Sequence, residues 1–133
     1  MSAPGMDKSM RDPLAQARGL GSAKDGVHHW WMQRLTAIAL ALLSPWFVWM
    51  LVSLIGATQS DVHATIANPR YALPLLAFVI ALFWHAKLGL QVVIEDYVHT
   101  RWLEVVLQVA MTFACALGAL TSVFAILRIV LAP

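Results

Sequence analysis

Three long stretches of the chain are apolar and are separated by short polar segments. Residues 35–60, 71–86 and 105–127 contain no Asp, Glu, Lys or Arg, and the second stretch continues past Lys87 as an apolar run. About 20 such residues in a helix cross the roughly 30 Å hydrocarbon core of a bilayer. The pattern therefore predicts three transmembrane helices, at about 31–56, 71–95 and 103–130.

The segments around these helices are polar. Residues 1–27 are expected to form a cytoplasmic N-terminal arm, and residues 28–133 a three-helix membrane anchor domain. The connection 57–70 contains Asn68-Pro69, a dipeptide typical of turns.

Composition excludes the other broad classes. Of 133 residues, 60% are hydrophobic and 12% are charged, and the mean hydropathy is +0.72. So small a soluble monomer could not bury this excess of apolar surface, and a disordered chain would not contain it. The net charge of +2 is too small to indicate a nucleic-acid partner, and the single Cys115 excludes a disulfide within the chain. We therefore predict an all-α integral membrane protein.

Small residues recur at every fourth position of the third predicted helix. Such a stripe allows another helix to approach closely, and three helices are enough for half of a shared helix bundle. The stripe consists of Ala110, Ala114, Gly118 and Ser122.

Positive charge is distributed unevenly about the predicted helices. Two of the nine Lys and Arg residues, Arg70 and Arg128, fall on one side of the membrane, and seven fall on the other. Cytoplasmic segments carry the excess of Lys and Arg, so the N-terminus is predicted inside and the C-terminus outside. The seven are Lys8, Arg11, Arg18, Lys24, Arg34, Lys87 (which can snorkel) and Arg101.

His85 lies near the middle of the second predicted helix. An ionisable group at that depth is a functional candidate, and a neutral imidazole is a good iron ligand. Gly89, one turn later, removes side-chain bulk, so that a flat cofactor could lie against the helix. The alternative is an imidazole that is hydrogen-bonded to a Ser or Thr of a neighbouring helix. A haem held by two histidines needs a second deep histidine, which this chain lacks, so the partner ligand would come from another chain.

Polar residues at the cytoplasmic boundary offer further chemistry. Asp96 and Tyr97 could deliver a proton and hydrogen-bond a carbonyl, or they could form an ordinary helix end with Tyr97 in the aromatic belt. Arg34 enters the first span and could bind a haem propionate or a lipid phosphate.

Two segments resemble the smaller hydrophobic membrane anchor of bacterial succinate dehydrogenase, or respiratory complex II. The family has a Gly-Val-His entry, and later His-x3-Gly followed by Asp-Tyr on one helix. The matching residues here are Gly26-Val27-His28, Arg34 and Thr36-Ala37-Ile38, then His85-Ala86, Gly89, Gln91-Val92 and Asp96-Tyr97.

The resemblance implies a set of roles. His85 would be an axial ligand of a haem b shared with the companion membrane anchor of the same complex. Tyr97, with Asp96 beside it, would bind ubiquinone. Arg34 and His28 would lie near the haem propionates and the quinone, although His29 follows His28, so either histidine could face the cofactor.

The resemblance also implies partners and a location. Flavoprotein and iron–sulfur subunits would carry electrons from succinate, an electron-transport step of the tricarboxylic acid cycle, so this chain would not be an enzyme on its own. It would lie in the bacterial inner membrane as a multi-pass anchor. A fumarate reductase anchor and a cofactor-free structural or assembly protein of the membrane remain the alternatives.

Overall fold

The structure, a computed structural model, describes residues 24–131. All regular secondary structure in this range is helical. Residues 24–131 form four helices, α2 (Lys24–Ser53), α3 (Gln59–Ala67), α4 (Pro69–Tyr97) and α5 (Arg101–Leu131). Three of them, α2, α4 and α5, are long and apolar enough to cross a membrane. The prediction of an all-α protein with three spans is therefore confirmed. Most of the expected N-terminal arm, residues 1–23, lies outside the described residues.

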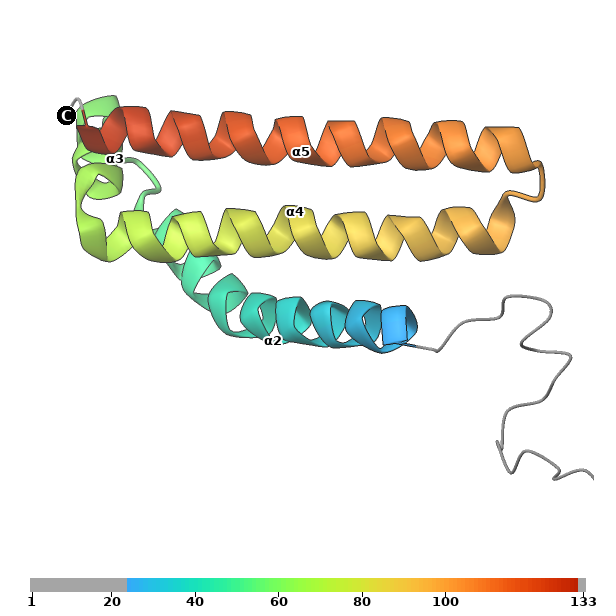
Figure 1. The fold of residues 1–133 in the computed structure, drawn as a ribbon. Coiled ribbons are helices and arrows are strands. Elements are labelled where there is room, and N and C mark those ends of the chain that lie inside the picture. The colour runs from blue at the N-terminus through green and yellow to red at the C-terminus, as the bar shows by residue number, and fades with distance from the viewer. Residues whose placement is uncertain (1–23, 132–133) are drawn as a thin grey trace, which may run out of the picture.

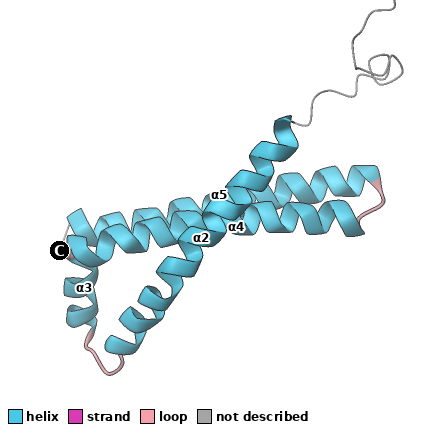
Figure 2. Cartoon of the chain, turned by 90° about the horizontal axis from the view of Figure 1, so that it is seen from below, coloured by secondary structure: helices cyan, strands magenta, loops and turns pink. Residues whose placement is uncertain are grey.

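The long helices lie in a row, with α4 between α2 and α5 (Figure 1). Helix α4 packs against both neighbours, and α2 crosses the α4–α5 pair at an angle (Figure 2). Only residues 98–100 join α4 to α5, so these two helices are antiparallel neighbours. The start of α2 and the α4–α5 connection consequently lie at one end of the bundle, and α3 lies at the other (Figure 1).

Helix α3 occupies most of the connection for which only a turn was predicted. Its start is a capping box. The Thr58 side chain accepts a hydrogen bond from the backbone N–H of Asp61, and the Asp61 carboxylate accepts one from the backbone N–H of Thr58. Asn68 then ends α3 and caps α4, since its side chain accepts a 3.0 Å hydrogen bond from the Arg70 N–H. The expected turn at Asn68-Pro69 is therefore the junction between two helices.

Helix α2 differs from its predicted bounds at both ends. It begins at Lys24, some residues before the apolar run, and ends at Ser53. The chain then turns through Gly56, which has a φ of +80°, a left-handed conformation that favours glycine. Hydropathy marks where a helix can be embedded in lipid. It therefore detects neither the helical turns in the polar flank before the span nor the end of the helix at Ser53, which lies inside the apolar run.

The buried core is small and lies where the three long helices meet near α3. Met50, Ala72, Leu75 and Ile126 form it. Beside it, the rings of Phe47 and Phe78 stack with centroids 4.5 Å apart. Most large apolar side chains elsewhere in residues 26–131 are exposed, which suits contact with lipid or with other membrane helices.

Candidate functional site

His85 lies on the face of α4 that meets α2. Its Nδ1 is 3.0 Å from the Oγ1 of Thr36 on α2. His85 precedes the end of α4 at Tyr97 by about 18 Å at 1.5 Å per residue. The imidazole is therefore deep in the span, as the sequence predicts, and a neighbouring helix holds one of its nitrogens.

The other ring nitrogen has no such partner. Nε2 of His85 makes no hydrogen bond to any residue in the described range, and the chain does not enclose it. The sequence left open two interpretations, an imidazole bonded to a Ser or Thr, or a ligand for iron. The hydrogen bond to Thr36 engages Nδ1, and an iron ligand requires only Nε2. The same imidazole can therefore do both.

A polar stripe on α2 continues from Thr36 towards the start of that helix. We define it as His29, Gln33 and Thr36, which are spaced by four and three residues and so share one helix face. Buried, unpartnered atoms occur at Gln33 (Oε1) and at His29 (Nε2). Sequence reasoning did not assign Gln33 a role, although this helical spacing of polar residues in an apolar segment could have found it.

Gly89 faces this stripe. A Cβ added at Gly89 would lie 3.8 Å from Gln33 Nε2, an ordinary van der Waals contact. A methyl group at this position would therefore still leave room for Gln33 of α2. Within this chain, the surface at Gly89 is covered by a side chain, whereas the sequence suggested a flat cofactor there.

The two neighbouring histidines of α2 differ in environment. His29 is half-buried, and at about 100° per residue it lies within about 20° of Thr36 around the helix. His28 is exposed. The structure therefore places His29, and not His28, on the same face as the residue that contacts His85.

Arg34 lies on a different face of α2. Its position is about 160° from that of Thr36 at 100° per residue, and the side chain is exposed. The guanidinium carbon is 5.5 Å from the centroid of the Trp30 ring, a cation–π geometry. Arg34 contacts Trp30 of its own helix, and it does not share a helix face with Thr36, the residue that contacts His85.

Asp96 and Tyr97 end α4 at the same end of the bundle as the start of α2. Both are exposed, Tyr97 to 78%. Their neighbour Glu95 is engaged instead: it accepts hydrogen bonds from Gln91 at 2.9 Å and from Gln108 of α5 at 3.4 Å. Asp96 and Tyr97 thus present free polar groups at the end of the span, far from His85.

The donor set near His85 fits half of a haem site. In the described part of the chain, no three His, Cys, Asp or Glu residues gather as metal ligands. A single imidazole with one nitrogen tethered and the other open is what one axial position requires. This chain could hold one side of a haem iron and would need a second ligand from elsewhere.

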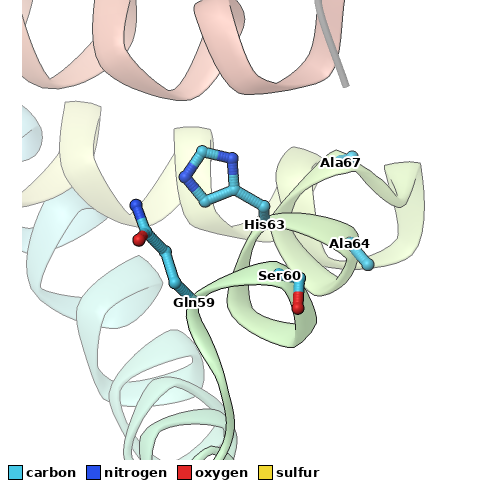
Figure 3. A pocket seen from close by; sticks show the side chains of 5 residues that line it. All are labelled: Gln59, Ser60, His63, Ala64 and Ala67. Carbon is cyan, nitrogen blue, oxygen red and sulfur yellow. The ribbon is translucent and has the colours of Figure 1, made fainter.

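Two grooves lie away from these residues. One follows α3 at the opposite end of the bundle, with Gln59 and His63 pointing to the same side (Figure 3). The other lies between α4 and α5, is apolar, has a volume of about 500 Å³ and includes Lys87 in its lining. Neither is lined by a candidate site residue.

Comparison with known proteins identifies the family. The sequence profile of the succinate dehydrogenase/fumarate reductase transmembrane subunit matches residues 8–119. The succinate dehydrogenase hydrophobic membrane anchor subunit of Rickettsia bellii is 42% identical over 108 residues, which cover 79% of this chain and 84% of that protein.

Two further relatives carry the same description. The protein of Rickettsia conorii is 32% identical over 117 residues, 85% of this chain and 90% of the relative. That of Paracoccus denitrificans is 36% identical over 85 residues, 64% of this chain and 66% of the relative. The resemblance drawn from the two sequence segments is confirmed, and the chain belongs to the family of succinate dehydrogenase hydrophobic membrane anchor subunits.

Proposed function

We propose that this membrane anchor supplies His85 as one axial ligand of a haem b that it shares with a companion anchor subunit. The observation that carries the proposal is the hydrogen bonding of the His85 imidazole, in which one ring nitrogen has a partner in the described range and the other has none there. His85 is deep in α4, its Nδ1 is held at 3.0 Å by Thr36, and its Nε2 has no hydrogen-bond partner among the described residues. Bound there, haem would supply a one-electron carrier.

The second axial ligand would come from the companion anchor. Two deep histidines are needed, and the other four histidines of the chain lie in its polar flanks and connections or at the start of α2. Exposed apolar faces on the described helices offer the surface on which a companion bundle would pack. Because so many apolar side chains remain exposed, these faces support a helix bundle shared with another chain and not one formed by this chain alone.

Asp96 and Tyr97 are proposed as this chain's part of the ubiquinone-reduction site. Tyr97 can donate its phenolic hydrogen to a quinone carbonyl, and Asp96 can deliver a proton. Support comes from their exposure at the end of α4, where neither is engaged with another described side chain.

Arg34 and His28 are proposed to lie near the haem propionates and the quinone. Both are exposed, and neither shares a helix face with Thr36. They would therefore act on groups held between α2 and the companion anchor. His29, on the inner face, would instead contact α4.

The end of the bundle that carries Asp96 is proposed to dock the iron–sulfur and flavoprotein subunits. It would face the cytoplasm of a bacterial inner membrane, with the C-terminus in the periplasm. The uneven distribution of Lys and Arg supports this orientation. Succinate oxidation would then belong to the soluble partners, and this chain would contribute no catalytic core of its own.

Substitution of His85 by Leu tests the proposal. Leu retains the apolar bulk and removes the ligand, so the b-type absorption spectrum of the purified complex should be altered or lost while the three spans still insert. His63→Leu is the matched control, because His63 is on α3 at the other end of the bundle. An unchanged haem spectrum in His85→Leu would show that His85 is not a ligand and that other residues hold the haem.

A further inference from the structure

Thr36 is the one buried polar residue among residues 26–131, with 8% of its surface exposed. Its hydroxyl oxygen has three neighbours within hydrogen-bond range. They are the Met32 carbonyl oxygen at 2.8 Å, the Gln33 carbonyl oxygen at 3.1 Å and His85 Nδ1 at 3.0 Å. Two of these belong to its own helix α2, and the third belongs to α4.

The number of hydrogens decides the direction of these bonds. A threonine hydroxyl has one hydrogen, and a carbonyl oxygen has none. The 2.8 Å contact with Met32 is a hydrogen bond only if Thr36 donates there, with Gln33 sharing the same hydrogen. His85 must then supply the hydrogen of the third bond, so its Nδ1–H donates to the Thr36 oxygen.

We infer that Thr36 is a positioning residue that holds His85 in the Nδ1–H tautomer and turns the Nε2 lone pair towards the haem iron. The inference rests on the proposed function of His85 as a ligand. Metal-binding histidines commonly donate their second ring N–H to an acceptor, which fixes the tautomer and the ring orientation and raises the basicity of the ligating nitrogen.

The helix gives Thr36 the rigidity that this role needs. A threonine in a helix is restricted at χ1, and its hydroxyl bonds back to a carbonyl three or four residues earlier, as it does here. The acceptor is therefore held in place by α2, whereas the ligand is on α4. The orientation of the imidazole consequently depends on how these two helices pack against each other.

Loss of the hydroxyl has a defined electronic consequence. Without an acceptor for the Nδ1–H, the imidazole donates less electron density through Nε2, so ferric haem loses more stabilisation than ferrous haem. The midpoint potential of the haem should therefore rise. The free ring could also rotate and take the other tautomer, so haem retention should fall, by about ten- to a hundredfold in affinity for a partner of this kind.

The test uses the complete complex with Thr36→Val and Thr36→Ser. Val matches the shape of Thr and replaces the hydroxyl with a methyl group, while Ser keeps the hydroxyl. Haem content, midpoint potential and the g-values of the ferric haem are measured for each. We expect Val to raise the potential and to lose haem, and Ser to remain close to the wild type.

Wild-type potential and haem content in Thr36→Val would overturn the inference. If that variant does not assemble, Thr36→Ala and Thr36→Ser decide, because both lose the methyl group and only Ser keeps the hydroxyl. Equal potentials in Ala and Ser would then overturn it. A normal haem spectrum in His85→Leu would refute the ligand itself, whereas loss of haem in His85→Leu with no effect in Thr36→Val would refute the role of Thr36 alone.

Discussion

Phe83 of α4 packs directly over Gly118 of α5. A Cβ built at position 118 would lie 2.5 Å from Cε1 and 2.8 Å from Cζ of that ring. Gly118 belongs to the stripe of small residues for which the sequence predicted close helix approach. Here the close approach is made within the chain, and the preceding members Ala110 and Ala114 are exposed.

Gly118→Ala should therefore loosen the packing of α4 on α5, because the Phe83 ring must move to admit the methyl group. Forced overpacking of this kind costs about 1–3 kcal/mol. The thermal denaturation midpoint of the purified complex should fall. In a Phe83→Leu background, Gly118→Ala should destabilise the protein much less. A double-mutant cycle measures this coupling between positions 83 and 118.

Gly89→Ala is the matched control for this prediction. Its new Cβ would meet only Gln33 Nε2 at 3.8 Å, an ordinary contact, so stability should change little. Equal destabilisation by the two glycine substitutions would contradict the specific role assigned to Phe83.

Tyr97→Phe should impair quinone reduction and spare assembly, since it removes a hydroxyl from an exposed ring. One hydrogen bond to developing negative charge on the quinone oxygen is worth about 1.5–3 kcal/mol. If quinone reduction limits turnover, the rate should fall roughly ten- to a hundredfold. Succinate oxidation with a dye that accepts electrons upstream of the quinone should stay near normal. Full quinone reductase activity in this variant would rule out the proposed role, and equal loss of both activities would indicate an assembly role.

Helix α3 should be accessible from the periplasm, because the uneven distribution of Lys and Arg predicts that orientation. In a Cys115→Ala background, a cysteine at the exposed position Ser60 should react with a membrane-impermeant maleimide in intact cells. A C-terminal fusion to a reporter active only in the periplasm should also be active. If labelling occurred only in permeabilised cells and the C-terminus proved cytoplasmic, the predicted orientation would be wrong.

The start of α3 should become less stable in acid. Hydrogen bonds from Thr58, first from its hydroxyl at 2.6 Å and then from its backbone N–H at 3.0 Å, hold the pKa of Asp61 below its usual value of 3.8. The contribution of the ionised Asp61 is fully present above pH 3.8. It is lost as the pH falls through the lowered pKa of the folded state.

Hydrogen exchange at the first amides of α3 measures this effect. Protection, corrected for intrinsic exchange rates, should decrease as the pH falls below 3.8 in the wild type. Asp61→Asn keeps an acceptor oxygen but cannot ionise, so its protection should be lower at neutral pH and should not show this decrease. A decrease in protection of the same size in the wild type and in Asp61→Asn would show that a group other than Asp61 causes it.

Local properties of the sequence were enough to identify the three spans. A segment crosses the bilayer because about 20 consecutive residues are apolar, and that property does not depend on what the segment packs against. The depth of His85 follows from its position in such a segment, and so does the placement of Asp96 and Tyr97 at a helix end. The capping box of Thr58 and Asp61 was also recognisable, but it lay in a segment that hydropathy treats only as a connection.

The contacts between helices needed the tertiary structure. Which residues of α2 meet His85 depends on the rotation and register of two helices, and many combinations bury similar apolar area. Only the packed structure places Thr36 at the imidazole and sets Gln33 over Gly89. The sequence by itself therefore determined that the chain spans a membrane with one deep histidine, and the packing of α2 on α4 decided which residue holds that histidine.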